Sequence, residues 1–91
     1  MVTAFTMLNV ARDAINQVAQ QLLKIDGVTE VYSVAGEWDL IAVLRMRDND
    51  QLAEVVTNHM LKLDAIKRSQ TLISFRVYSN YELEAMFDLG S

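Results

Sequence analysis

The spacing of hydrophobic residues changes several times along this chain. Residues 2–8 are apolar or β-favouring at every position, as in a strand that is covered on both faces. Apolar residues then recur at spacings of four and three, the pattern of an amphipathic helix, at Ala11, Ile15, Val18, Leu22 and Ile25. Asn9 is placed to cap the start of this helix, and Gly27 lies where the end of a helix favours a left-handed backbone.

The same succession of strand and helix follows in the rest of the chain. A strand is predicted over residues 28–35, a tight connection at Gly36-Glu37, and a second, nearly continuous apolar strand over residues 39–47. Carboxylates at 48–50 mark the start of a second helix, where the macrodipole favours them, and this helix buries Leu52, Val56, Met60 and Leu63. A last strand is predicted over 71–78, with Ile73, Phe75 and Val77 on one face and Ser74 and Arg76 on the other. Asn80 is placed to cap a short terminal helix with an apolar side of Leu83, Met86 and Phe87.

The order of elements predicts the fold class. It is β-α-β-β-α-β, the ferredoxin-like α+β arrangement, followed by a short C-terminal helix. An internal repeat agrees with two similar halves, since Lys-Ile-Asp-Gly-Val at 24–28 has a counterpart in Lys-Leu-Asp-Ala-Ile at 62–66. Right-handed crossovers would place both helices on one face of a four-stranded antiparallel sheet. We expect residues 1–79 to form one domain and residues 80–91 a helical tail.

Helices on one face leave the other face of the sheet open. The first and third strands do not alternate, because several of their apolar residues lie among neighbours that are also apolar: Ala4, Leu8, Leu40, Ala42, Leu44 and Met46. At about 25 cal/mol per Å², leaving several such side chains in water forfeits several kcal/mol. A second copy of the chain is therefore predicted to cover the open face, giving a homo-oligomer. The alternative is that the terminal helix folds back over it.

Composition narrows the function classes. The chain has 91 residues, with twelve acidic and eight scattered basic residues and a net charge of -4, so direct binding to nucleic acid is not expected. It has no cysteine, which excludes disulfides and thiolate-bound metals. No apolar stretch is long enough to span a membrane and no signal peptide is recognisable, so a cytoplasmic location is expected.

Few residues offer catalytic chemistry. The single histidine, His59, is next to Met60 in the buried stripe, and neither a nucleophile nor an orienting carboxylate accompanies it locally. No metal-ligand spacing and no phosphate-binding glycine loop occur, so no catalytic residue, metal or cofactor is expected. Glu37 and Asp39 project to one side of a strand, where they could share a proton, bind a cation, receive an ammonium group or serve only the turn. Trp38 between them is either an interface aromatic or a wall over a substrate.

The residues around this pair resemble a known family. The stretch Val-Ala-Gly-Glu-Trp-Asp-Leu-Ile at 34–41 is similar to the Gly-x-aromatic-Asp signature of the effector-binding domain of the Lrp/AsnC family, the RAM domain. Further matches are the helix exit Leu-Lys-Ile-Asp-Gly-Val-Thr-Glu-Val-Tyr and Thr71 at the start of the last strand. The resemblance covers residues 1–79, and the opening Met-Val-Thr-Ala-Phe resembles members that consist of this domain alone.

The resemblance implies a non-catalytic domain that binds small effectors, commonly amino acids. Such domains form homodimers through their sheets, and the dimers associate further, often as an octamer. The effector would bind between dimers at a loop that falls on Gly36, Glu37, Trp38 and Asp39. Gly36 would let the backbone approach the ligand and Asp39 would pair with an α-ammonium group. The opposing wall would come from Ser69, Thr71 and Ser74.

Two departures from the family pattern affect the expected function. Trp38 replaces the more usual Tyr, which changes the size of the pocket, and the helix-turn-helix of full-length regulators is missing. The expected function is amino-acid sensing in transcriptional or metabolic regulation without a DNA-binding domain of its own. Mixed assembly with a full-length Lrp/AsnC regulator is a further hypothesis. The effector and the ring size are left open.

Two other functions use the same fold. Small ferredoxin-like monooxygenases include enzymes that use Asn, His and Trp, and Asn9, Trp38 and His59 supply that trio here. An ACT-like regulatory domain shares the topology and the ligand class, but it usually has a glycine after its first strand, where this chain has Asn9-Val10-Ala11.

Overall fold

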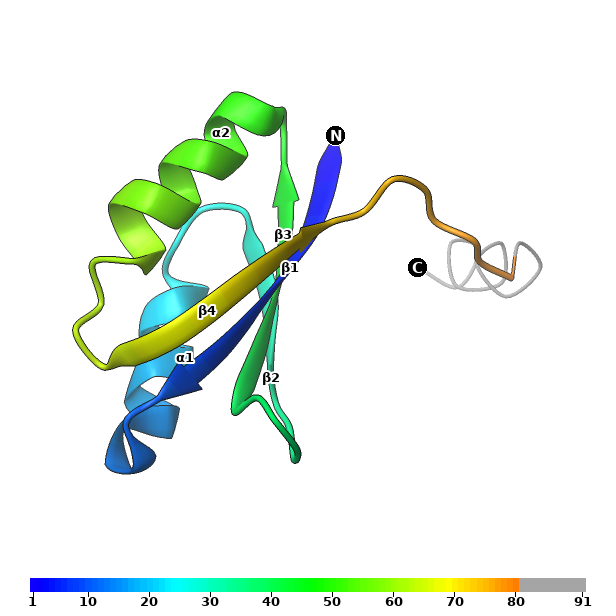
Figure 1. Cartoon of the computed structure of the whole chain (residues 1–91). Coiled ribbons are helices and arrows are strands. Elements are labelled where there is room, and N and C mark those ends of the chain that lie inside the picture. The colour runs from blue at the N-terminus through cyan, green and yellow to red at the C-terminus, as the bar shows by residue number, and fades with distance from the viewer. Residues whose placement is uncertain (81–91) are drawn as a thin grey trace.

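The computed structural model describes residues 1–80, which form a four-stranded antiparallel sheet with both helices on one side (Figure 1). The strands lie in the order β2-β3-β1-β4. Their bounds are Val2–Val10 for β1, Val28–Ser33 for β2, Leu40–Met46 for β3 and Ile66–Ile73 for β4. The helices are α1 at Ile15–Leu23, entered through the 3₁₀ turn η1 at Arg12–Ala14, and α2 at Asn49–Glu54, which continues as the π-helix η2 at Val55–Met60. The predicted ferredoxin-like fold is confirmed.

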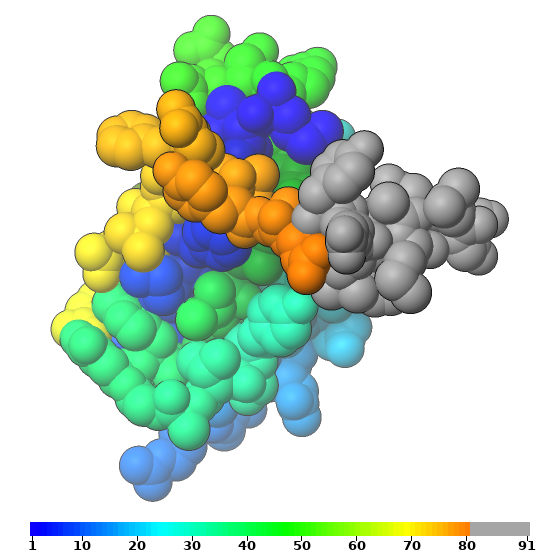
Figure 2. Space-filling model, turned by 90° about the vertical axis from the view of Figure 1, so that its right-hand side faces the viewer, coloured from blue at the N-terminus to red at the C-terminus, as the bar shows by residue number. Residues whose placement is uncertain are grey.

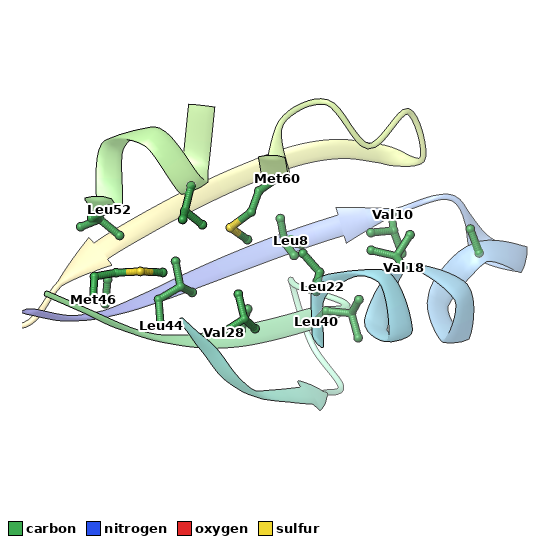
Figure 3. Close-up of a cluster of buried hydrophobic side chains, with 14 residues drawn as sticks. Leu8, Val10, Val18, Leu22, Val28, Leu40, Leu44, Met46, Leu52 and Met60 are labelled. Carbon is green, nitrogen blue, oxygen red and sulfur yellow. The ribbon is translucent and has the colours of Figure 1, made fainter. Parts of the chain in front are cut away.

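The core lies between the sheet and the helices. Alternate residues of β1 and β3, among them Leu8, Leu40 and Leu44, point into this layer (Figure 3). They pack against Val18 and Leu22 of α1, two residues of the predicted helical stripe. Figure 3 also shows Met60 reaching into the same cluster from the second helix.

The second helix differs from a regular α-helix after Glu54. Asp48 caps it, since its Oδ1 accepts a hydrogen bond of 2.8 Å from the backbone N–H of Gln51. Val55 and Met60 are both buried although they are five residues apart, because the wider turn of the π-helix brings such residues to one side. Val56, predicted as part of the buried stripe, is only partly buried.

The predicted last strand over residues 71–78 is wrong. β4 begins at Ile66 and ends at Ile73, so only three of the predicted residues belong to it. β4 is an edge strand, and edge strands tolerate polar residues. The polar run at 67–70 is therefore part of the strand, although such a run in a sequence is typical of a loop. The main chain makes one more link to β1, from the N–H of Ser74 to the carbonyl of Thr3 at 2.9 Å. The segment 74–80 then projects from the sheet (Figure 1).

Two further expectations concern the ends of helices. Asn9 does not cap the first helix, since it lies within β1 and no side chain caps η1. Gly27 does have the expected left-handed backbone, with φ of +95°. The predicted terminal helix over residues 80–91 lies outside the described residues except for Asn80, its predicted cap.

The sheet face away from the helices carries apolar side chains from all four strands among polar ones. Cross-strand partners point to the same face, so the register assigns to it Glu30, Tyr32, Ile41, Val43, Arg45, Thr3, Phe5, Met7, Asn9, Arg68, Gln70 and Leu72. We call this set the open face. Figure 2 looks onto this face of the molecule. Within residues 1–80, no helix is long and apolar enough to cross a membrane.

Candidate functional site

The loop between β2 and β3 is folded against the end of β1. The backbone N–H of Val34 donates to the carbonyl of Asp39 across the loop at 3.0 Å. The N–H of Asp39 donates to the carbonyl of Leu8 at 2.9 Å. Gly36, at the tip, has φ of +123°, a conformation that side chains disfavour. The sequence therefore places a glycine where this loop reverses direction.

The Asp39 carboxylate fastens the loop to β1. Its Oδ2 accepts hydrogen bonds from the backbone N–H of Val10 at 3.0 Å and from Nδ2 of Asn9 at 3.3 Å. The same Asn9 amide donates to the carbonyl of Glu37 at 2.9 Å. One oxygen of Asp39 therefore serves the fold, and these bonds do not use its second oxygen.

Arg68, on β4, contacts the same loop. It pairs with Asn9 in the β1–β4 ladder, and its Nε donates to Oδ1 of Asn9 at 3.0 Å. One terminal nitrogen donates to Oε1 of Glu37, also at 3.0 Å. The guanidinium carbon lies 4.3 Å from the centre of the Trp38 ring, a cation–π contact. We call these five residues, Asn9, Glu37, Trp38, Asp39 and Arg68, the loop cluster.

The loop cluster combines one cation with two carboxylates at a surface that small solutes can reach. The side chains of Arg68 and Glu37 are 54% and 71% exposed, whereas Trp38 and Asp39 are half-buried. Hydrogen bonds thus hold a positively charged donor and negatively charged acceptors close together. Such a set suits a small molecule that carries both charges.

The structure brings only part of the predicted effector site together. Glu37, Trp38 and Asp39 belong to the loop cluster, with Gly36 beside them in the same loop. Ser69 and Thr71 pair with Leu8 and Thr6, whose side chains face the helices, so within one chain they point away from the cluster.

Thr71 and Ser74 have other partners in this chain. The Thr71 hydroxyl lies 2.9 Å from that of the buried Thr6. The Ser74 hydroxyl donates to the carbonyl of Arg76 at 3.5 Å. Within one chain, the polar residues predicted as the opposing wall therefore do not contact the loop.

Two residues of the loop cluster, Asn9 and Arg68, are absent from the predicted site. The sequence pattern predicts Asn9 as a helix cap, and it places Arg68 before a strand that begins only at Thr71. The signal that could have found them is the strand period, because a strand starting at Ile66 places Arg68 opposite Asn9.

The trio considered for an oxygenase is not assembled. His59 is exposed on η2 and lines a cavity of about 330 Å³ with Lys24, Arg47 and Glu54. Asn9 and Trp38 lie on the opposite side of the sheet. Within residues 1–80, no group of three His, Cys, Asp or Glu residues could hold a metal ion.

A second polar contact lies on the open face, in β2. The hydroxyl of Tyr32 donates to the Glu30 carboxylate on the same side of the strand. This hydrogen bond and the negative charge of Glu30 raise the pKa of Tyr32 above its ordinary value.

The chain matches a known family of ligand-binding domains. A family model described as the Lrp/AsnC ligand binding domain matches residues 3–83. An uncharacterized HTH-type transcriptional regulator of Pyrococcus abyssi is 33% identical over 76 residues, which are 80% of this chain and 51% of that protein. The chain thus spans about half the length of the curated relatives it matches.

Solved structures agree with this match. A Thermus thermophilus protein superposes with a TM-score of 0.83 at 35% identity, over 88% of this chain and 100% of that one. A Neisseria meningitidis transcriptional regulator, solved as a complex with L-methionine, superposes with a TM-score of 0.78 at 18% identity, over 87% of this chain and 53% of that one. The second similarity establishes the fold alone.

Proposed function

The chain belongs to the family of Lrp/AsnC ligand-binding domains, and from this premise we propose that it binds an α-amino acid at the loop cluster and acts as a non-catalytic regulatory domain. The observation that carries the proposal is the loop cluster itself, in which Arg68, Glu37 and Asp39 present opposite charges side by side. Relatives that are HTH-type transcriptional regulators support a role in transcriptional or metabolic regulation. We place this role in the cytoplasm, with no direct contact to nucleic acid.

The residues of the loop have distinct proposed roles. A Cβ on Gly36 would meet nothing within 4 Å, so the backbone there is open to a ligand. The second oxygen of Asp39 is proposed to accept from the α-ammonium group. Ser69, Thr71 and Ser74 remain candidates for the opposing wall. Since Ser69 and Thr71 face the helices in their own chain, a second copy would have to supply them.

Assembly is the second part of the proposal. We propose a homodimer through the open face and a higher oligomer such as an octamer, with the effector site between dimers. Exposed apolar side chains on the open face, such as Phe5 and Leu72, support the dimer. Co-assembly with a full-length Lrp/AsnC regulator is the proposed route to DNA, and a native-mass experiment that finds no mixed oligomer with such a regulator would remove it.

A thermal-shift screen against the twenty L-amino acids tests effector binding. An amino acid present at about 100 times its Kd adds about 2.7 kcal/mol of stability if it binds only the folded state. For a domain of this size, the expected rise in Tm is about 11–22 °C. We expect a selective rise for one or a few amino acids, with L-methionine as the first to try. No rise with any of the twenty would contradict amino-acid binding.

A further inference from the structure

Arg68 is held in place by contacts that do not depend on the Glu37 side chain. Its Nε donates to Asn9, and its guanidinium carbon lies over the Trp38 ring, 4.3 Å from the ring centre. Asn9 is itself fixed, because its amide donates to Asp39 and to the main-chain carbonyl of Glu37. The guanidinium therefore keeps its position if the Glu37 side chain moves away, and a ligand that replaces that side chain meets an ordered receptor.

The Arg68–Glu37 pair is easily opened. Both side chains are more than half exposed, so solvent screens the ion pair and its contribution to stability is small. Hydrogen bonds to Asn9 and Glu37 use two of the five N–H groups of Arg68. Once Glu37 leaves, a planar carboxylate can bind the guanidinium through two parallel hydrogen bonds.

We propose that an α-amino acid inserts its zwitterion into this ion pair. Arg68 takes the α-carboxylate, and Glu37, released from Arg68, accepts a hydrogen bond from the α-ammonium group. The ammonium has three N–H donors, so it can bond to Glu37 and to the second oxygen of Asp39 at once. The inference rests on the proposed function and adds the residues that recognise each end of the effector.

Insertion accounts for selectivity by charge balance. A zwitterion adds no net charge. Its α-carboxylate takes the place of Glu37 on Arg68, and its α-ammonium group takes the place of Arg68 on Glu37. An amine without the carboxylate would leave Arg68 unpaired after Glu37 has turned away. An acid without the amine would leave Glu37 without its partner. The site should therefore prefer a ligand with both groups on one carbon over either half of it.

The test compares three probes by calorimetry: L-methionine, methioninol, which lacks the carboxylate, and 4-(methylthio)butanoate, which lacks the amine. If another amino acid stabilises the wild type most in the twenty-member screen, its amino alcohol and its deaminated acid are used instead. We expect the zwitterion to bind about 10- to 100-fold more tightly than either analogue, since hydrogen bonds to charged groups are the strong ones.

Two variants separate the roles. Arg68→Gln should weaken binding of the amino acid about 10- to 100-fold and strengthen binding of methioninol, because Glu37 loses its internal competitor. Glu37→Gln should weaken methioninol and strengthen 4-(methylthio)butanoate, because the internal competitor for Arg68 is weakened. A merely structural role for the pair would not produce these opposite effects. Arg47→Gln, exposed after the end of β3 that lies away from the loop cluster, is the matched control and should bind as the wild type does.

The outcomes distinguish the inference from the function it rests on. If the wild type binds an amino acid and Arg68→Gln binds it equally well, insertion is wrong and effector binding stands. If Arg68→Gln weakens the binding of methioninol as much as the binding of the amino acid, Arg68 does not bind the carboxylate, and insertion is again wrong. If no amino acid binds the wild type, both proposals fall.

Discussion

At the scale of single residues, Gly27 is the position where the backbone leaves least choice. It has φ of +95°, and a Cβ there would lie 2.5 Å from the sulfur of the buried Met46. Gly27→Ala should therefore lower the free energy of unfolding by about 2 kcal/mol, measured by urea denaturation. Gly36→Ala is the control, since it shares the positive φ but has open space around the Cβ, and it should lose less. Equal losses would mean that Met46 moves aside without cost.

Asp39 is predicted to act on both the fold and the effector. Asp39→Asn keeps an oxygen for the Val10 N–H but loses the charge that the α-ammonium would meet. We expect Asp39→Asn to weaken amino-acid binding about tenfold or more without changing the oligomeric mass. Asp39→Ala should in addition lower stability by about 1–2 kcal/mol, because the Val10 N–H loses its acceptor. An unchanged Kd for Asp39→Asn would discard its ligand role.

At the scale of elements, the edge strand β4 is tied to β1 by one buried pair of side chains as well as by its main chain. The Thr6 hydroxyl belongs to a residue that is 1% exposed and lies 2.9 Å from the Thr71 hydroxyl. Thr71→Val should cost about 1–2 kcal/mol of unfolding free energy, because it leaves the Thr6 hydroxyl buried without a partner. The double variant with Thr6→Val should cost less than the sum of the two single variants. Additive losses would show that the two hydroxyls do not interact, and Thr57→Val on the exposed side of η2 is the control.

The elements also show where sequence patterns succeed and where they fail. Val18 and Leu22 are correctly predicted as buried because a helical stripe depends only on local spacing. The strand β4 is predicted five residues late, because an edge strand can carry polar residues at 67–70 without losing its ladder. That error hides Arg68, whose contact with Asn9 spans 59 residues and depends on register, not on local spacing. Glu37, Trp38 and Asp39 are found because they are adjacent in the chain.

At the scale of the whole molecule, the sheet has two unlike sides. One side is sealed by the two helices over the core, and the open face carries apolar side chains from all four strands. Beyond β4, Phe75, Val77 and Tyr78 add exposed apolar surface at 75–78. Exposed apolar side chains gathered on one face favour association through that face, so we expect copies of the chain to associate through the open face rather than through the helices.

Phe5→Lys tests which side of the molecule associates. Phe5 lies on β1, a central strand, and is 38% exposed on the open face, so a lysine there can reach solvent in the single chain but not in a sheet-to-sheet dimer. Burial of a Phe side chain is worth about 1.5–3 kcal/mol, and a symmetric interface loses it twice. We expect the mass by light scattering to fall towards the 10.3 kDa of one chain. Leu61→Lys, 52% exposed after η2, is the control and should keep the wild-type mass. The reverse result would place the interface on the helical side.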